Sequence, residues 1–235
     1  HHGLTKHSFS PVSDISLHLA KGEIVAVIGA SGSGKSLLAH TLLGLLPKNA
    51  KWHGTVTFQG EALTEPRMRL LRGKKIALIP QSVAYLNPLA RVGNQVLRAA
   101  RLCGQDKATA RENTNRTFGR YALQPPVKAL FPFQVSGGMA RRVLTASATV
   151  GSAELIIADE PTTGLDPLVA AKALDHLREL ADEGKGVLLI THDLATAVRI
   201  AQRVVVVYAG KTVEITAAKN FHTPDKLLHP YTRAL

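Results

Sequence analysis

Near its start the chain has a run of residues with the types and spacing of a phosphate-binding loop. The run fits Gly-x-x-x-x-Gly-Lys-[Ser/Thr], in which glycines let backbone N–H groups come close to an anionic phosphate. The lysine of such a loop reaches the β- and γ-phosphates, and the serine hydroxyl coordinates Mg²⁺. A plain glycine-rich turn has no need of the Lys-Ser pair in register, so we predict an ATP and Mg²⁺ site. The predicted nucleotide-binding residues here are Gly29, Ala30, Ser31, Gly32, Ser33, Gly34, Lys35, Ser36 and Leu37.

Polar side chains follow three further apolar segments, where predicted strands end. Asp159 and Glu160 come directly after one such segment, His192 after another and Gln81 after a third. Open α/β sheets bind ligands at this edge. With a phosphate loop present, we expect Asp159 to hold Mg²⁺ and Glu160 to act as the base for an attacking water. His192 can touch the γ-phosphate or that water, and Gln81 the metal or the water.

A second glycine turn, Ser136-Gly137-Gly138, runs into a predicted helix. The N-terminus of a helix is a potential anion site. One chain has no obvious use for two phosphate sites, whereas two copies meeting face to face can combine them. The sequence therefore indicates a nucleotide site shared between two subunits.

The composition is that of a globular protein of 235 residues with 45% hydrophobic and 20% charged residues. Apolar runs such as 204–208 are of strand length and too short to cross a bilayer. The single cysteine, Cys103, excludes an internal disulfide. We expect a cytosolic protein without a secretory leader. The net charge of +12 suits nucleic acid, an anionic membrane face or nucleotide phosphates, and equally a solvated basic surface, so it does not decide between functions.

Strand patterns alternate with helical ones, which predicts an α/β fold with a largely parallel sheet. Residues 54–60 alternate like an exposed antiparallel strand, and residues 82–150 have helical spacing, as in a helical insertion. We divide the chain into a first core part (1–82), a helical subdomain (83–150) and a second core part (151–235). The predicted strands are 23–29, 75–79, 154–158, 186–190, 203–207 and 211–215, and the predicted core helices are 35–46, 168–182 and 194–201.

In their order along the chain, these motifs resemble those of the ATP-binding cassette (ABC) ATPases. The set comprises the phosphate loop, Gln81, residues 136–138, Asp159-Glu160, the Gly164-Leu165-Asp166 loop and His192. The resemblance covers nearly the whole chain. It implies a P-loop NTPase core with an antiparallel β region and an inserted helical subdomain. It also implies a head-to-tail dimer in which each ATP lies between one phosphate loop and the Ser-Gly-Gly turn of the other subunit, with Asp166 nearby.

Three features are similar to the oligopeptide, dipeptide and nickel importers of this family. They are Leu86-Asn87-Pro88 with Val92-Gly93-Asn94-Gln95, Met139 in place of the more common glutamine, and the terminal residues 229–235. We therefore expect the ATPase subunit of a membrane importer for peptides, nickel or a metal chelate. Its partners would be a second ATPase subunit, identical or related, permease subunits and, indirectly, an extracytoplasmic solute-binding protein. It would then be a peripheral protein at the cytoplasmic face of the cell membrane.

The main alternative is an ABC-type ATPase that acts on nucleic acid or chromosomes, which the basic charge encourages. Chromosome-associated members need a long coiled-coil insertion, and no sustained heptad run interrupts this chain. A translation-associated member usually holds two cassettes, and there is one phosphate loop here. An exporter ATPase is disfavoured only by the importer-like features.

The chain departs from the family pattern at three places. Arg141 stands where glutamine is common, which is expected to alter the second anion site without abolishing it. An upstream aromatic residue often stacks on adenine in this family, and Phe9 and His7 are poor candidates for that role. A terminal cysteine cluster found in many peptide-importer ATPases is missing from these 235 residues.

Overall fold

A six-stranded sheet runs through the centre of the computed structural model, which describes residues 10–235. The strand order is β4-β5-β6-β1-β7-β8, and every neighbouring pair is parallel except β7 and β8. The predicted α/β architecture with a largely parallel sheet is confirmed. The strands are β1 (Ile24–Ile28), β4 (Ile76–Ile79), β5 (Leu155–Asp159), β6 (Gly186–Thr191), β7 (Arg203–Tyr208) and β8 (Lys211–Ala217).

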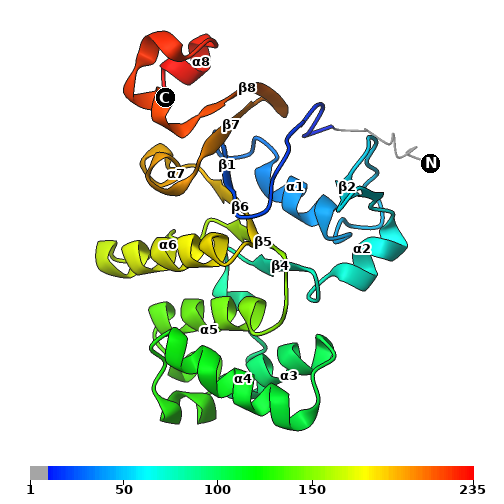
Figure 1. Cartoon of the computed structure of the whole chain (residues 1–235), viewed down its shortest axis with the longest axis vertical. Coiled ribbons are helices and arrows are strands. Elements are labelled where there is room, and N and C mark those ends of the chain that lie inside the picture. Colours follow the sequence, from blue (N-terminus) through cyan, green and yellow to red (C-terminus); the bar gives the residue numbers. More distant parts are fainter. Residues whose placement is uncertain (1–9) are drawn as a thin grey trace, which may run out of the picture.

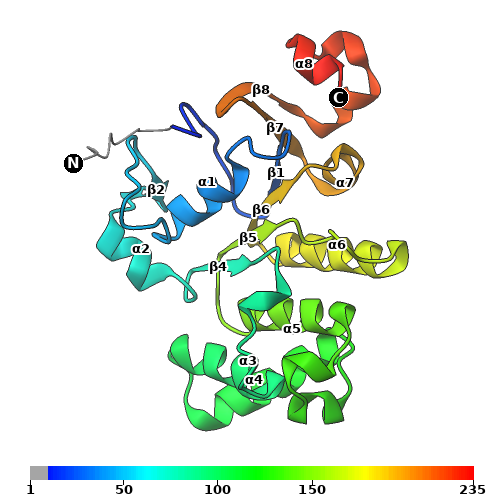
Figure 2. The ribbon, with the colours of Figure 1, turned by 180° about the vertical axis from the view of Figure 1, so that it is seen from behind.

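Helices cover both faces of the sheet, so its central strands are buried on both sides (Figures 1 and 2). One face packs against α1 (Lys35–Leu42) and α2 (Glu65–Leu71), and the other against α6 (Pro167–Asp182) and α7 (Leu194–Ile200). All five residues of β1 are buried, and their side chains alternate between the two cores. A continuous apolar run is what a parallel interior strand requires.

Helices also dominate the segment between β4 and β5, at the lower end of Figure 1. They are α3 (Val92–Leu102), α4 (Lys107–Arg120) and α5 (Gly137–Thr149), accompanied by three short 3₁₀ turns. Their buried apolar side chains, which belong to residues 86–150, form a cluster separate from the two clusters on the faces of the sheet. The 3₁₀ turns of this segment are η1 (Val83–Tyr85), η2 (Pro125–Ala129) and η3 (Pro132–Gln134).

Two predicted elements are shorter than the sequence pattern indicated. The strand expected at residues 54–60 is a small hairpin of β2 (Thr57–Phe58) and β3 (Glu61–Ala62). Both turn residues, Gln59 and Gly60, have positive φ (55° and 80°), as a tight two-residue hairpin turn requires. Helix α1 ends at Leu42, not at residue 46, because Gly44 takes a left-handed φ of 61° and Pro47 follows.

The segment after β8 folds back beside the sheet as two 3₁₀ turns, η4 (Ala218–His222) and η5 (Pro224–Lys226), and a short helix, α8 (Pro230–Arg233). The carboxylate of Glu214 on β8 is buried and accepts hydrogen bonds from the backbone N–H groups of Leu228 (3.0 Å) and His229 (2.9 Å). These bonds anchor the start of α8. Among residues 10–235, no helix combines the length and apolarity that a bilayer crossing needs.

Candidate active site

Four strands of the sheet bring the predicted site residues to one edge. Strands β4, β5, β6 and β1 are consecutive neighbours and run parallel, so their carboxyl ends meet at the same edge. The register pairs Ile79 with Ala158, Asp159 with Ile190, and Ile28 with Thr191. Gln81, Glu160, His192 and the phosphate loop therefore leave the sheet side by side. The structure confirms this part of the sequence-based reasoning.

The phosphate loop is a cradle built from main chain. A Cβ on Gly29 would lie 2.1 Å from the carbonyl oxygen of Val207, so only glycine fits there. Gly32 and Gly34 have φ of 79° and 92°, in the left-handed region that glycine adopts without strain. The buried Lys35 donates from Nζ to the carbonyl oxygens of Gly29 (2.7 Å) and Ala30 (2.9 Å). Its ammonium therefore lies inside the turn that the glycines form.

Two carboxylates and a lysine share this edge in a buried setting. The Ser36 hydroxyl donates to Oδ1 of Asp159 at 3.3 Å, which brings together two of the three residues predicted to hold Mg²⁺. Burial lowers the pKa of Lys35, and the negative charges of Glu160 and Asp159 oppose that shift. Burial also raises the pKa of Asp159; the charge of Glu160 adds to this rise, and the Ser36 hydrogen bond opposes it. Such opposed charges in a water-poor setting are suited to a ligand that is itself charged.

Glu160 is held in one orientation by three side chains. Its Oε1 lies 2.7 Å from Nδ1 of His192, and its Oε2 accepts from the hydroxyls of Thr163 (3.1 Å) and Thr191 (3.3 Å). The residue itself has a φ of 48°, a strained value for glutamate, while its N–H donates to Ile190. Strain of this kind persists where the surroundings determine the geometry, and it collects at functional sites. The contacts leave a carboxylate placed to accept a proton.

Thr163 and Thr191 were not among the residues predicted from the sequence. Thr191 is fully buried at the end of β6, directly before His192, and Thr163 lies in the loop after β5. Thr191 is adjacent to His192 and Thr163 lies three residues after Glu160, and hydroxyl residues this near predicted catalytic residues are a signal that could have drawn attention to both.

The remaining predicted residues do not join this cluster. Gln81 is exposed, and in residues 10–235 its side chain makes no hydrogen bond to the other site residues, although its carbonyl oxygen accepts one from Arg141. Asp166 caps α6 by accepting from the N–H groups of Leu168 and Val169 (both 3.1 Å). Ser136 caps α5 in the same way, accepting from Met139 at 3.2 Å. His7 and Phe9 lie outside the described residues.

The Ser-Gly-Gly turn is open to solvent and far from the phosphate loop of its own chain. A Cβ on Gly137 would meet no atom within 4 Å, and one on Gly138 only the side chain of Val169 at 3.9 Å. In both ribbon views α5 lies at the lower end with α3 and α4, whereas α1, which follows the phosphate loop, lies above β4 (Figures 1 and 2). The turn predicted to be a second anion site is therefore accessible to another molecule.

The residues at the sheet edge fit ATP and Mg²⁺. With glycines at its left-handed positions, Gly32 and Gly34, the loop can turn backbone N–H groups toward a phosphate. The buried Ser33 hydroxyl has no hydrogen-bond partner within residues 10–235. A serine hydroxyl and a carboxylate at 3.3 Å are oxygen ligands of the kind that Mg²⁺ prefers beside phosphates.

Comparisons with known proteins agree with this site. The family model for the ABC transporter matches residues 12–163. A probable peptide ABC transporter ATP-binding protein of Sinorhizobium fredii is 39% identical, over 94% of this chain and 68% of that protein. The oligopeptide transport ATP-binding protein OppD of Salmonella typhimurium is 38% identical, over 95% and 69%. The dipeptide transport ATP-binding protein DppD of Escherichia coli is 37% identical, over 100% and 74%.

Solved structures show the same fold. The ATP-binding subunit of an ABC transporter superposes with a TM-score of 0.76 at 27% identity, covering 90% of this chain and 85% of that one. A bacterial ABC transporter cassette, solved as a dimer, superposes with a TM-score of 0.79 at 26% identity, covering 88% and 90%. The chain therefore belongs to the ABC transporter family and is one of its ATP-hydrolysing cassettes.

Proposed function

We propose that this chain is the ATPase subunit of a membrane importer for peptides and that it hydrolyses ATP as a dimer. One observation carries the proposal. Groups for binding and hydrolysing ATP meet at one sheet edge, while a second anion site stands open and apart on α5. In this proposal one chain supplies the phosphate loop of one ATP site and the Ser-Gly-Gly turn of another, and pairing with a second cassette completes both sites.

In this proposal each residue at the sheet edge has a defined task. The loop of residues 29–37 surrounds the phosphates, and Lys35 turns from its own carbonyls toward the β- and γ-phosphates. Ser36, Asp159 and Gln81 would hold Mg²⁺, which when bound neutralises charge on the phosphate oxygens. Glu160 accepts a proton from the attacking water, and His192, Thr163 and Thr191 keep its carboxylate oriented.

The second subunit supplies the other half of each site. Ser136, Gly137 and Gly138 present backbone N–H groups at the start of α5, with the positive end of the helix dipole behind them. We propose that they grip the γ-phosphate of ATP held by the partner, with Asp166 at the same interface. The partner is an identical chain or a related ATPase subunit.

The peptide cargo is proposed from the relatives and from this chain's own residues. Relatives at 37–39% identity are named for peptide, oligopeptide and dipeptide transport, and none of those three is named for nucleic acid. Asn87 and Gln95, two of the importer-like residues, bond to each other: Gln95 Oε1 accepts from Asn87 N (2.9 Å), and its Nε2 donates to Asn87 O (3.0 Å). They fix the loop that leads into α3. Nickel or a metal chelate is the second candidate cargo.

The same proposal assigns a role to the helical segment. Residues 83–150 have their own apolar cluster, so they can move as a unit against the two core parts, residues 1–82 and 151–235. We propose that this helical subdomain transmits dimer closure to permease subunits, which places the protein peripherally at the cytoplasmic face of the membrane. A solute-binding protein would deliver the peptide from outside.

Reconstitution in liposomes tests the proposal. The chain would be combined with the permeases and binding protein encoded beside it, and ATP hydrolysis measured with a mixed peptide pool or with nickel chelates. We expect peptides to stimulate hydrolysis and to be taken up in an ATP-dependent way. Stimulation by nickel chelates alone would replace the peptide assignment, and hydrolysis indifferent to every permease combination would argue against an importer.

A further inference from the structure

Arg141 on α5 is a buried arginine that holds two loops of the active-site edge together. Only 9% of its surface is exposed. Its Nη1 donates to the carbonyl oxygens of Gln81 and, at 3.4 Å, of Pro80, and its Nη2 donates to Thr163 at 3.0 Å. One guanidinium thus joins α5 to the loop after β4 and to the loop after β5.

The acceptors of Arg141 are unusual for a buried cation. All three are backbone carbonyls, no carboxylate pairs with Arg141 within residues 10–235, and its buried Nε has no partner there. Burial lowers the pKa of the guanidinium, which means that the charged form is held at a cost. A buried charge without a counter-ion is not expected to stabilise the fold. The rigid, planar fork of arginine is, however, suited to bonding two separate segments at once.

The loops that Arg141 joins lead directly to the reacting groups. Thr163, whose carbonyl accepts from Arg141, donates its own hydroxyl to Oε2 of Glu160. Gln81 is the residue expected at the metal or water. At the other end, α5 begins at the Ser-Gly-Gly turn, five residues before Arg141. The guanidinium therefore lies between the part of the chain that faces the partner's ATP and the part that handles its own.

We propose that Arg141 is a positioning residue that sets the Glu160 and Gln81 loops relative to α5. This inference rests on the proposed ATPase dimer and adds a residue to it. Movement of α5, caused by binding to the partner's nucleotide, reaches Thr163 and hence the carboxylate of Glu160. Arg141 does not touch ATP, so its loss lowers the rate of the chemical step and leaves nucleotide binding intact.

Two substitutions of similar size separate this role from simple packing. Arg141→Met keeps the buried stem and removes every donor, whereas Arg141→Gln is also neutral but keeps an N–H₂ group for the two loops. Arg72→Met is the matched control. Arg72 also donates to main-chain carbonyls, those of Leu43 (3.2 Å) and Gly44 (3.5 Å), but these lie at the far end of α1 from the phosphate loop.

Steady-state hydrolysis by the chain with its cognate second ATPase subunit is the readout. Arg141→Met should lower kcat about tenfold or more, since small misplacements of catalytic groups are costly, with KM for ATP within about threefold of wild type. Arg141→Gln should recover most of that kcat, and Arg72→Met should keep it. Equal kcat values for Arg141→Met, Arg141→Gln and wild type would overturn the inference, as would a rise in KM alone. If Arg141→Met does not fold, Arg141→Leu decides: it also lacks every donor, so kcat should fall about tenfold or more, and a wild-type kcat refutes the role.

A double-mutant cycle with Thr163→Val tests the route to Glu160. Thr163→Val removes the hydroxyl that donates to Glu160 and leaves the carbonyl that accepts from Arg141. If both residues act through the position of Glu160, their effects on kcat combine to less than the product of the two single effects. Independent effects would overturn the route. Two results would count against the proposed function: a wild-type chain that does not hydrolyse ATP, or a Glu160→Gln variant that hydrolyses it at the wild-type rate. If the wild type hydrolyses ATP, Glu160→Gln does not and the Arg141 variants have a wild-type kcat, only the role of Arg141 is wrong.

Discussion

Replacing Glu160 by glutamine separates the proposed proton-accepting role of its carboxylate from its role in the fold. The amide keeps the volume and the branching of the side chain. Its oxygen can still accept from the Thr163 and Thr191 hydroxyls, and its N–H₂ group can face Nδ1 of His192, which then acts as an acceptor in the neutral tautomer. The local hydrogen bonds are therefore conserved, and the lost property is proton affinity.

This geometry gives the expected size of each effect. With its contacts conserved, Glu160→Gln should change the free energy of unfolding by less than about 1 kcal/mol, which corresponds to a Tm shift within about 2–4 °C in a chain of this size. Without a general base, hydrolysis should fall about 10²–10⁴-fold. That fall is equivalent to about 2.7–5.4 kcal/mol of barrier, at 1.36 kcal/mol per tenfold.

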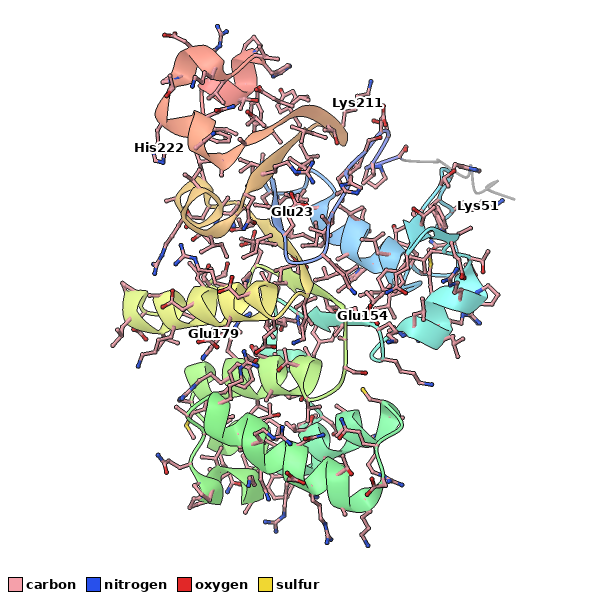
Figure 3. The ribbon with its side chains drawn as sticks, in the orientation of Figure 1. Glu23, Lys51, Glu154, Glu179, Lys211 and His222 are labelled. Carbon is pink, nitrogen blue, oxygen red and sulfur yellow. The ribbon has the colours of Figure 1, made fainter. Side chains whose placement is uncertain are left out.

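The assay is single-turnover and steady-state ATP hydrolysis, with Mg-ATP affinity measured by calorimetry on the same samples. Glu154→Gln is the control, since Glu154 (labelled in Figure 3) precedes β5 just as Glu160 follows it, and it pairs with Lys75 away from the site. We expect Glu154→Gln to hydrolyse ATP normally and Glu160→Gln to bind ATP without turning it over. Turnover by Glu160→Gln within tenfold of wild type would remove Glu160 from the role of base.

Three further changes test the remaining parts of the site. Lys35→Ala should weaken Mg-ATP binding in calorimetry, because a charge aimed at the β- and γ-phosphates is lost; undiminished affinity would contradict the loop assignment. Gly137→Asp should abolish ATP-driven dimerisation in light scattering and hydrolysis with the cognate partner, whereas Gly119→Asp, in an equally open helical position on α4, should affect neither. Burial raises the pKa of Asp159, so the folded state loses stability as pH rises from about 4 through that raised value. In calorimetric scans without nucleotide, Asp159→Asn should therefore raise Tm at pH 7 by a few degrees. It should also reduce the fall of Tm between about pH 4 and 7. A Tm at pH 7 below that of the wild type would show that the buried charge of Asp159 is compensated.

Residues at the ends of regular elements were the ones that sequence patterns could place. Gly29, Glu160 and His192 each lie at the end of a largely apolar strand, and parallel strands bring such positions to one edge whatever the order of the strands. The sequence predicted one strand over residues 54–60, where the structure has a hairpin over Thr57–Ala62. The alternation of apolar and polar residues continues into the turn at Gln59 and Gly60, whose positive φ angles reverse the chain.

Contacts between distant segments could not be read in the same way. Arg141 is 60 residues from Gln81 and 22 from Thr163, and a sequence pattern records neither separation as proximity. From the sequence, Arg141 was only a departure from the family pattern, expected to affect the anion site at the start of α5. In the structure its side chain donates to the backbone of the loops that carry Gln81 and Thr163, while the expected effect on the anion site stays a prediction. The consequence of the substitution depends on packing, which only the fold reveals.

The buried charges of this chain explain why nucleotide binding is expected to change the stability of the fold. Lys35, Arg141, Asp159 and Glu160 are four of the five buried charged side chains in residues 10–235, and all four serve the same sheet edge. Buried charges are costly unless they are paired, and here the pairing is incomplete, with the pKa of Asp159 raised and those of Lys35 and Arg141 lowered. Phosphates would supply the negative charge that Lys35 lacks, and Mg²⁺ the positive charge that Asp159 lacks. ATP at about 100 times its Kd stabilises a folded chain by about 2.7 kcal/mol through mass action alone. The edge of the sheet is therefore expected to gain stability when nucleotide binds, and under the proposal above Arg141 would carry that change to α5, the helix proposed to face the partner subunit.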